Sequence, residues 1–387
     1  MKTLLLVAGD ASGDQHAAEF VRTFRELHPD TRFVGMGGVE MERCGVDLAV
    51  NQRELAIGGF LELVSSAHRI VRAWRKMVSA LRAEDPDLVV LVDSGGFNLP
   101  FARRVRRISK APLLYYVAPQ VWAWRRGRVR KLASRIDRMA LILPFEAAIY
   151  ADHDVSVEFV GHPLADRFPG VEARMDRDEA RRVLGVEPMG FLVTLMPGSR
   201  RNEVAQNLPL QLEAARRLHR DHPDLGFVLG LAPSITAASV DAICSRAGLP
   251  ADLRLSVVTG QPYEAIRAAD VVLAKPGIVT LEAAVLERPM VVMGRVHPLT
   301  AAILRRWVKA PYFAMPNLIA ECEVVPELLQ DDARPDEMAR RLHQLLEGPV
   351  RERQLKGLEE VRRRLGGGGA PRRASRIAEE MLGLASS

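Results

Sequence analysis

The segment LVVLVDSGGFN at residues 88–98 is the clearest guide to the fold class, because an unbroken apolar run ends at an acid, a serine and two glycines. Five consecutive apolar residues fit a strand that is buried on both faces, and Asp93 opens the polar loop after it. Comparable short runs recur along the chain, separated by longer segments with helical spacing. This alternation predicts an α/β protein built on parallel sheets.

The predicted strands form two sets, separated by a polar stretch through Asp176-Arg177-Asp178. We therefore expect two Rossmann-like domains facing a cleft, over residues 1–165 and 166–345, with terminal helices over 346–387. The predicted strands are Thr3–Ala8, Arg32–Met36, Leu88–Asp93, Leu113–Val117, Met139–Leu143 and Glu158–Val160, then Phe191–Met196, Gly226–Leu231, Arg254–Val258, Val271–Ala274 and Met290–Met293. The predicted helices include Gln15–Leu27, Arg69–Glu84, Asn207–Arg220, Ser234–Ala247, Val279–Leu286 and Arg372–Leu384.

Length and composition are those of a folded protein with more than one core, at 387 residues, 48% hydrophobic and 26% charged. Cys44, Cys244 and Cys322 lie far apart without metal-ligand spacing, which indicates a reducing compartment and no cysteine-bound metal. The first apolar run lacks the features of a secretion signal, and no run approaches the ~18 apolar residues of a membrane span. We expect a cytoplasmic protein that could still sit on a membrane surface.

The net charge of +6 is a mild surplus, but much of it is concentrated in one place. Residues 122–135, WAWRRGRVRKLASR, carry six Lys or Arg and no acid. This run is either a solvated helix face or a patch for the phosphates of anionic lipid or RNA. Trp122 and Trp124 fit either a membrane interface or a wall between domains. With 5% aromatic residues and no RNA-binding signature, the RNA alternative is disfavoured.

Ligands of open parallel sheets bind beyond the carboxyl ends of the strands, so the loops after the predicted strands are the candidate sites. The first loop, GDASGD at residues 9–14, offers Gly13 for close backbone approach and Ser12 or Asp14 as a cap for the next helix. It lacks the GxGxxG fingerprint expected of a nicotinamide-dependent dehydrogenase, and no Walker lysine follows it.

Asp93 is the candidate catalytic group, because a carboxylate at the end of a buried strand can accept a proton if desolvation raises its pKa. The alternative role is that of an N-cap for the following helix. Asp14 and His16 in the neighbouring loop are the competing candidates for the base. His162, after the last strand of the first domain, either lines the cleft or caps the backbone.

Two loops of the second domain are suited to a diphosphate. Pro197-Gly198-Ser199-Arg200 offers backbone amides and a guanidinium, which match phosphate oxygens. In Lys275–Glu282, a glycine turn opens a helix whose amino end can take phosphate, while an acid one turn inside can bind two ribose hydroxyls. The candidate residues for nucleotide binding are Gly198, Ser199, Arg200, Gly277, Thr280 and Glu282.

At this point the chain resembles the lipid A disaccharide synthase family, from near residue 4 to near residue 330. YYVAPQVWAWR and FVGHPL are highly specific, whereas MPGSR and KPGIVTLEAA are shared more widely among UDP-sugar transferases. The matching motifs are AGDASGD (8–14), FVGMGG (33–38), VD…FN (92–98), YYVAPQVWAWR (115–125), LPFE (143–146), FVGHPL (159–164), MPGSR (196–200) and MPNLIAECEVVPELLQ (315–330).

The resemblance implies a GT-B type glycosyltransferase that joins UDP-2,3-diacylglucosamine to 2,3-diacylglucosamine 1-phosphate (lipid X). The product is a β-1,6 disaccharide, formed with inversion, release of UDP, and neither cofactor nor metal. It implies that Asp93 is required, that Arg200 is functionally important, and that the carboxyl-terminal region packs back on the first domain. A cytoplasmic enzyme on the inner face of the inner membrane would meet anionic lipid but no nucleic acid, and homo-oligomerisation stays open.

Ser12, Gly13, Asn98, Trp122, His162 and Asn317 are the candidate acceptor or cleft residues. Two positions depart from the family pattern. Gly96 stands where a second acid is usual, and Lys275-Pro276-Gly277 replaces Ser-Gly-Thr. The second departure is more like transferases that glycosylate diacylglycerol, so a UDP-sugar transferase with such an acceptor is the alternative.

Overall fold

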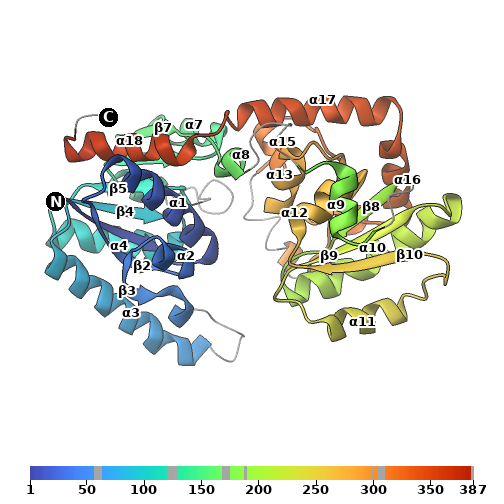
Figure 1. Ribbon diagram of the computed structural model, residues 1–387, viewed down its shortest axis with the longest axis horizontal. Coiled ribbons are helices and arrows are strands. Elements are labelled where there is room, and N and C mark those ends of the chain that lie inside the picture. Colours follow the sequence, from blue (N-terminus) through green and yellow to red (C-terminus); the bar gives the residue numbers. More distant parts are fainter. Residues whose placement is uncertain are drawn as a thin grey trace. The chain divides into compact units, whose positions relative to one another are not determined.

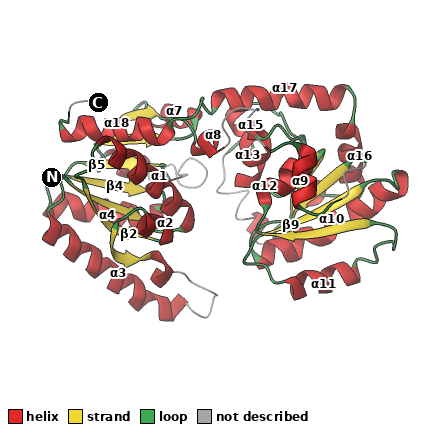
Figure 2. Ribbon diagram, in the orientation of Figure 1, coloured by secondary structure: helices red, strands yellow, loops and turns green. Residues whose placement is uncertain are grey.

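The computed structural model describes residues 1–55, 63–119, 127, 129–167, 175–186, 190–298, 300–302 and 310–384. The chain divides into two compact units (Figure 1). The first contains Met1–Asp166 and Gly366–Ser387, and the second contains Arg167–Leu365. Helices cover both faces of a sheet in each unit (Figure 2). The predicted α/β fold with two parallel sheets is confirmed.

In the described part of the first unit, seven parallel strands pair in the order β3-β2-β1-β4-β5-β6-β7. The strands are β1 (Thr3–Ala8), β2 (Arg32–Gly37), β3 (Asp47–Asn51), β4 (Leu88–Val92), β5 (Leu113–Tyr116), β6 (Arg138–Leu141) and β7 (Ser156–Phe159). The helices are α1 (Ala11–Leu27), α2 (Val39–Arg43), α3 (Leu63–Glu84), α4 (Gly95–Ile108), α6 (Val129–Ala133), α7 (Ala147–Tyr150), α8 (Pro163–Arg167) and α18 (Ala370–Leu382).

In the described part of the second unit, six parallel strands pair in the order β10-β9-β8-β11-β12-β13. They are β8 (Leu192–Met196), β9 (Gly226–Leu231), β10 (Arg254–Thr259), β11 (Val271–Ala274), β12 (Met290–Gly294) and β13 (Glu327–Leu329). The helices are α9 (Arg177–Val183), α10 (Arg201–Asp221), α11 (Ala237–Arg246), α12 (Pro262–Ala268), α13 (Ile278–Val285), α15 (Met315–Ala320), α16 (Pro335–Leu346) and α17 (Pro349–Arg364).

Each sheet has a switch point beside its first strand, where the chain turns from one side of the sheet to the other. In the first unit β1 pairs with both β2 and β4, and Ala8 lies opposite Val92 at the carboxyl end. In the second unit β8 pairs with both β9 and β11, and Met196 lies opposite Ala274. The loops after these strand pairs are therefore neighbours within each unit, and they are the loops that the sequence singles out.

The predicted strands are found to within two residues at either end, whereas two further strands, β3 and β13, are missed. The central strands are continuous apolar runs, and every residue of β4 is fully buried. By contrast, β3 (DLAVN) and β13 (ELL) are short, partly polar, and lie at a sheet edge, so their residues give little apolar signal. Neighbouring strands, not their own composition, specify them.

The boundary of the terminal helices differs from the prediction of 346–387, because the chain returns to the first unit only at Gly366. α17 belongs to the second unit, where Gln354 donates to the carbonyl of Met290 (3.1 Å) and accepts from its amide (2.7 Å). α18 belongs to the first unit. There the buried Glu379 binds His28 at 2.7 Å, and Asp166 caps the helix through the amides of residues 369 and 370.

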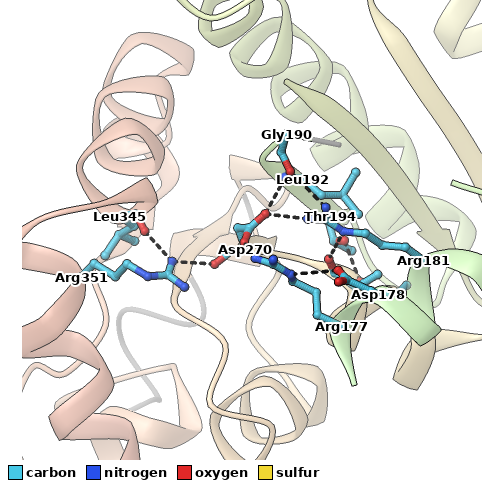
Figure 3. A network of polar contacts seen from close by, with 11 residues as sticks. Arg177, Asp178, Arg181, Gly190, Leu192, Thr194, Asp270, Leu345 and Arg351 are labelled. Carbon is cyan, nitrogen blue, oxygen red and sulfur yellow. Dashed lines mark hydrogen bonds and ion pairs between the residues drawn. The ribbon is translucent and has the colours of Figure 1, made fainter. Parts of the chain in front are cut away.

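A buried ion-pair network fixes the amino end of the second sheet (Figure 3). The carboxylate of Asp270 accepts from Arg181 (2.7 Å), Arg177 (2.6 Å) and the Leu192 amide (2.8 Å). Arg181 is 1% exposed and also donates to the carbonyls of residues 190 and 268. Arg351 of α17 donates to the Asp270 carbonyl at 2.9 Å. One aspartate thus joins α9, β8, β11 and α17.

Replacement of Asp270 tests this network. Asp270→Ala leaves the buried Arg181 guanidinium without its carboxylate, so the free energy of unfolding should fall by about 3–5 kcal/mol. Asp270→Asn keeps the size and shape of the side chain, so it should lower the free energy of unfolding by less. The control is Asp178→Ala, because Asp178 is exposed and pairs with Arg177 only at 3.6 Å. Denaturant unfolding with equal losses for Asp270→Ala and the control would contradict the role given to Asp270.

Candidate active site

The backbone turn after β4 presents the Asp93 carboxyl group. Asp93 and the next residue, Ser94, both have positive φ, at 47° and 40°. Two side chains hold the Asp93 carbonyl: the Asn98 amide donates at 2.9 Å and the Tyr115 hydroxyl at 2.5 Å. Asn98 also donates to the carbonyl oxygens at the ends of β1 and β4, at Val7 and Val92. Asn98 is fully buried, and its hydrogen bonds shape the turn. This role accounts for an asparagine at position 98 without the predicted contact to an acceptor.

The pKa of Asp93 is raised from its ordinary 3.8 to about 6. Burial is the main cause, the nearby negative charge of Asp10 adds to it, and the Ser94 amide partly offsets both. A carboxyl group with this pKa is ionised at neutral pH, and it holds a proton more strongly than an exposed aspartate does. Both properties suit a general base.

Asp10 is a functional candidate that the sequence analysis missed as an individual residue. It is the N-cap of α1 and accepts from the Gly13 amide at 2.8 Å, so the cap is neither Ser12 nor Asp14 as the sequence suggested. Its other carboxylate oxygen accepts from the Ser94 hydroxyl at 2.7 Å, which joins the loops after β1 and β4. Its position directly after an apolar strand was the available signal.

Asp14 is held by backbone amides of a neighbouring helix. It is 3% exposed, and its carboxylate accepts from Gly38 (2.6 Å), Glu40 (3.0 Å) and Met41 (3.2 Å) at the amino end of α2. A Cβ on Gly38 would stand 2.6 Å from this carboxylate, so a larger residue there would displace it. Through these contacts Asp14 holds the amino end of α2 against α1.

His16 and His162 lie close to each other at the carboxyl end of the first sheet. The ring of His16 meets Tyr116 edge-on, with centroids 6.5 Å apart. His162 is 3% exposed, and burial, with a smaller effect of His16, lowers its pKa to about 3, so it is neutral. Its Nδ1 accepts from the Leu164 amide at 3.1 Å at the start of α8. Of the two roles considered for His162, the structure shows backbone capping.

In the second unit, Glu203 organises the loop Pro197–Arg200. Its Oε2 accepts from the amides of Ser199 (3.0 Å) and Arg200 (3.3 Å). Gly198 has φ 133°, and a Cβ there would lie 2.6 Å from the same oxygen. The Arg200 side chain is 80% exposed. Glu203 is not among the residues predicted from the sequence, although an acid three residues into a helix is a capping signal.

The second predicted loop leads into α13, with Gly277 as its N-cap at φ 155°. Thr280 is fully buried, and its hydroxyl donates to the Gly277 carbonyl at 2.8 Å and accepts from the Met315 amide at 3.3 Å. Thr280 therefore fastens α13 to α15. Burial raises the pKa of Glu282, and Arg167 partly opposes this rise.

Asn317 is another predicted site residue with a structural environment. It is fully buried, and its amide group makes bonds to the backbone of residues 324 and 325 and to Glu327. Ser12 is exposed and Gly13 is buried in the first turn of α1. Trp122 and Trp124, with Arg125, Arg126 and Arg128 of the basic run, lie outside the described residues.

The departure at Gly96 is not explained by lack of space, in contrast to the glycine before it. Gly95 is required, because a Cβ there would stand 2.7 Å from Pro119. Around Gly96 no described atom lies within 4 Å of a Cβ position, so packing does not require glycine there. The absence of a second acid is thus a property of this sequence rather than of its fold.

Comparison with known proteins places this chain in a family. Residues 4–381 match the family model of lipid-A-disaccharide synthetase. The lipid-A-disaccharide synthase of Geobacter sulfurreducens is 39% identical over 381 residues, covering 98% of this chain and 97% of the relative. That of Pseudomonas fluorescens is 40% identical over 383 residues, covering 98% of each.

Solved structures with the same fold are more distant in sequence. A UDP-GlcNAc 2-epimerase from Neisseria meningitidis matches with a TM-score of 0.62 at 12% identity, covering 99% of both chains. Acinetobacter baumannii MurG matches with a TM-score of 0.60 at 11% identity, covering 98% of this chain and all of that one. These matches show the fold alone.

The two parallel sheets have the GT-B type of fold, and the family match makes the chain a glycosyltransferase with this fold. Within that class, the chain belongs to the lipid-A-disaccharide synthetase family, which condenses UDP-diacylglucosamine with lipid X. Because the match covers nearly the whole chain, it favours this reaction over the alternative transfer to diacylglycerol.

The structural role of Asp14 can be tested by stability. Asp14→Ala removes the acceptor of three backbone amides, so the free energy of unfolding should fall by at least about 2 kcal/mol. The control is Glu42→Ala, an exposed acid on the same α2, which should change stability by less than about 0.5 kcal/mol. A stable Asp14→Ala protein without turnover would return Asp14 to the candidates for the base.

Proposed function

We propose that Asp93 is the general base of an inverting transfer from UDP-2,3-diacylglucosamine to lipid X. The acceptor hydroxyl oxygen attacks the anomeric carbon, and the bond from this carbon to the diphosphate breaks. The proton of the acceptor hydroxyl passes to the Asp93 carboxylate, and UDP leaves with the electron pair of the broken bond. The observation that carries the assignment is a mostly buried carboxyl group with a raised pKa at the switch point of the first sheet.

The fixed backbone around Asp93 supports this role. Asn98 and Tyr115 both donate to the Asp93 carbonyl, so the strained turn is held without using the carboxylate. Asp10 caps α1 and Asp14 accepts from three backbone amides, whereas the Ser94 amide only partly offsets the rise in the pKa of Asp93. Among these three neighbouring acids, Asp93 is the one whose environment is suited to proton transfer.

We propose that UDP binds to the second unit at the loops after β8 and β11. Arg200 has an exposed guanidinium, and α13 presents its amino end behind Gly277. Both favour the diphosphate. Glu282, in the second turn of α13, is mostly buried, and we assign it to the ribose hydroxyls. Ser199 and Gly198 contribute backbone groups to the site. Thr280 holds α13 in position through its bonds to Gly277 and Met315.

No metal is required in this scheme, because the cationic loops can offset the charge of departing UDP. In the part of the chain that is described, no three His, Cys, Asp or Glu side chains come together as a metal site. Metal independence remains a prediction, for which turnover in EDTA is the direct measurement.

We propose that the protein binds anionic membranes through α3 and α4, since both substrates carry acyl chains. The sequence has no Asp or Glu from residue 63 to 83 or from residue 95 to 110. Trp74 of α3 packs edge-on against Phe97 and Phe101 of α4, with centroids 5.6 and 5.8 Å apart. The acid-free stretches of these two helices are therefore neighbours on one side of the first sheet (Figure 1).

The outer surface of these helices combines positive charge with apolar groups. Arg72 and Arg75 of α3 and Arg103 and Arg107 of α4 are exposed. Ile70 and Val71 are 41% and 47% exposed. Basic residues beside exposed apolar ones are typical of helices that lie on an anionic bilayer. No helix in the described ranges is both long and apolar enough to cross a membrane.

Turnover of Asp93→Asn tests the base. Loss of general-base help should lower kcat by roughly 10²- to 10⁴-fold while UDP affinity stays unchanged. For the unaltered enzyme, kcat/KM should rise with pH and level off above about 6, because only ionised Asp93 accepts the proton. Asp10→Asn, which still caps α1, should move this rise to lower pH.

Stability supplies the control for that variant. The raised pKa of Asp93 favours folding at low pH, and this contribution is lost as pH rises from about 3.8 through about 6. At pH 7 the Asp93→Asn protein should therefore be at least as stable as the original. A stable Asp93→Asn enzyme with nearly full turnover would rule out the assignment.

Vesicle flotation tests the membrane surface. At low salt, Arg72→Ser/Arg75→Ser should weaken binding to anionic vesicles about 10- to 30-fold, from about 1 kcal/mol per basic residue. Arg220→Ser/Arg246→Ser, two exposed arginines of the second unit, removes the same charge and should have little effect. High salt should weaken binding of all variants. Equal binding to neutral vesicles, or equal losses in both double variants, would refute this surface.

A further inference from the structure

Lys275 and Glu203 form an ion pair between the two loops at the switch point of the second sheet. Lys275 Nζ lies 3.1 Å from Glu203 Oε1. Lys275 directly follows β11, and its amide donates to the carbonyl of Met196 at the end of β8. Its side chain is 29% exposed and that of Glu203 is 14% exposed. Neither residue has a part in the reaction as described so far.

The Glu203 carboxylate binds the hydrogen-bond donors and cations of this loop in the way that phosphate oxygens would. One carboxylate oxygen binds the amides of Ser199 and Arg200, and the other faces Lys275 and, at 3.7 Å, the Arg200 guanidinium. Burial raises the pKa of Glu203, but Lys275 and these donors outweigh it and hold the pKa below the ordinary value. The carboxylate is therefore ionised at neutral pH.

Lys275 is placed to reach both loops. Its Nζ is 3.9 Å from the position of a Cβ on Gly277, the N-cap of α13. The loop is held without Lys275. The Asn207 side chain donates to the carbonyl of Pro197 and accepts from the amide of Arg295, so it joins the two segments.

We propose that Lys275 binds the diphosphate of the nucleotide donor and that Glu203 takes the place of this diphosphate when the site is empty. The inference rests on the proposed binding of UDP to the second unit. A diphosphate on Lys275 would face the Glu203 carboxylate at close range, and like charges at such a distance repel. Glu203 therefore leaves Lys275 as nucleotide enters, and returns as UDP departs, which weakens product binding.

Calorimetry with UDP, UMP and uridine tests both residues in a double-mutant cycle. Lys275→Met should weaken UDP binding about 10- to 100-fold, UMP less, and uridine by under about twofold, because only phosphate contacts are lost. Glu203→Gln keeps an oxygen for the Ser199 amide but removes the competing charge, so UDP should bind about 3- to 10-fold more tightly. This gain should vanish in Lys275→Met/Glu203→Gln. Lys356→Met, an exposed lysine of α17, is the matched control.

The outcomes separate this inference from the proposed function. Each of three results would overturn this inference but not the proposed function. They are a UDP affinity that Lys275→Met does not change, weaker UDP binding by Glu203→Gln, and a gain in UDP affinity from Glu203→Gln that persists in the double variant. A larger loss for glucosamine 1-phosphate than for UDP would assign Lys275 to the acceptor phosphate and overturn it too. An unaltered protein that binds neither UDP nor uridine would overturn both. Thermal unfolding confirms that each variant is folded.

Discussion

The parallel pairing of β1 with β4, and of β8 with β11, is the constraint on which the rest of this protein depends. These strands come from distant segments, yet their carboxyl ends lie level because Ala8 faces Val92 and Met196 faces Ala274. Buried strands can meet in this way only if the helices between them cross to the faces of the sheet. The loops after each pair then adjoin, and the polar residues of these loops form the candidate sites.

Polar groups near the ends of the strands fall into two kinds. Asp270, Asn317 and Asp14 are buried and accept several hydrogen bonds, so they hold helices and strands in place. Asp93 is different, because its carbonyl is held and its carboxyl pKa is raised. The same burial that destabilises ionised Asp93 makes it a better base, which is the usual relation between stability and activity at a catalytic site.

In the second unit, one acid can serve both the empty and the occupied site. The amides of Ser199 and Arg200, the amino end of α10 and Lys275 together attract an anion. Left unfilled, such a group of donors would repel one another and remain unsatisfied. Glu203 supplies the charge from within the helix, and an entering diphosphate can replace it. Binding is then an exchange of anions, whose strength depends on how well Glu203 competes.

The sequence by itself determined the fold class, the two sheets and their central strands, because continuous apolar runs such as 88–92 are specified locally. It also identified the loops that hold Asp93 and Arg200, since their residue types follow directly after such runs. Only the tertiary structure decided which polar residues form hydrogen bonds that hold the fold together. Asp14 and Thr280 look like site residues until their helix-end partners, which are distant in sequence, are known, and Asn317 until its bond to the amide of Val324 is known. The edge strands and the Glu203–Lys275 pair were hidden for the same reason: each depends on a neighbour that the chain brings near only after folding.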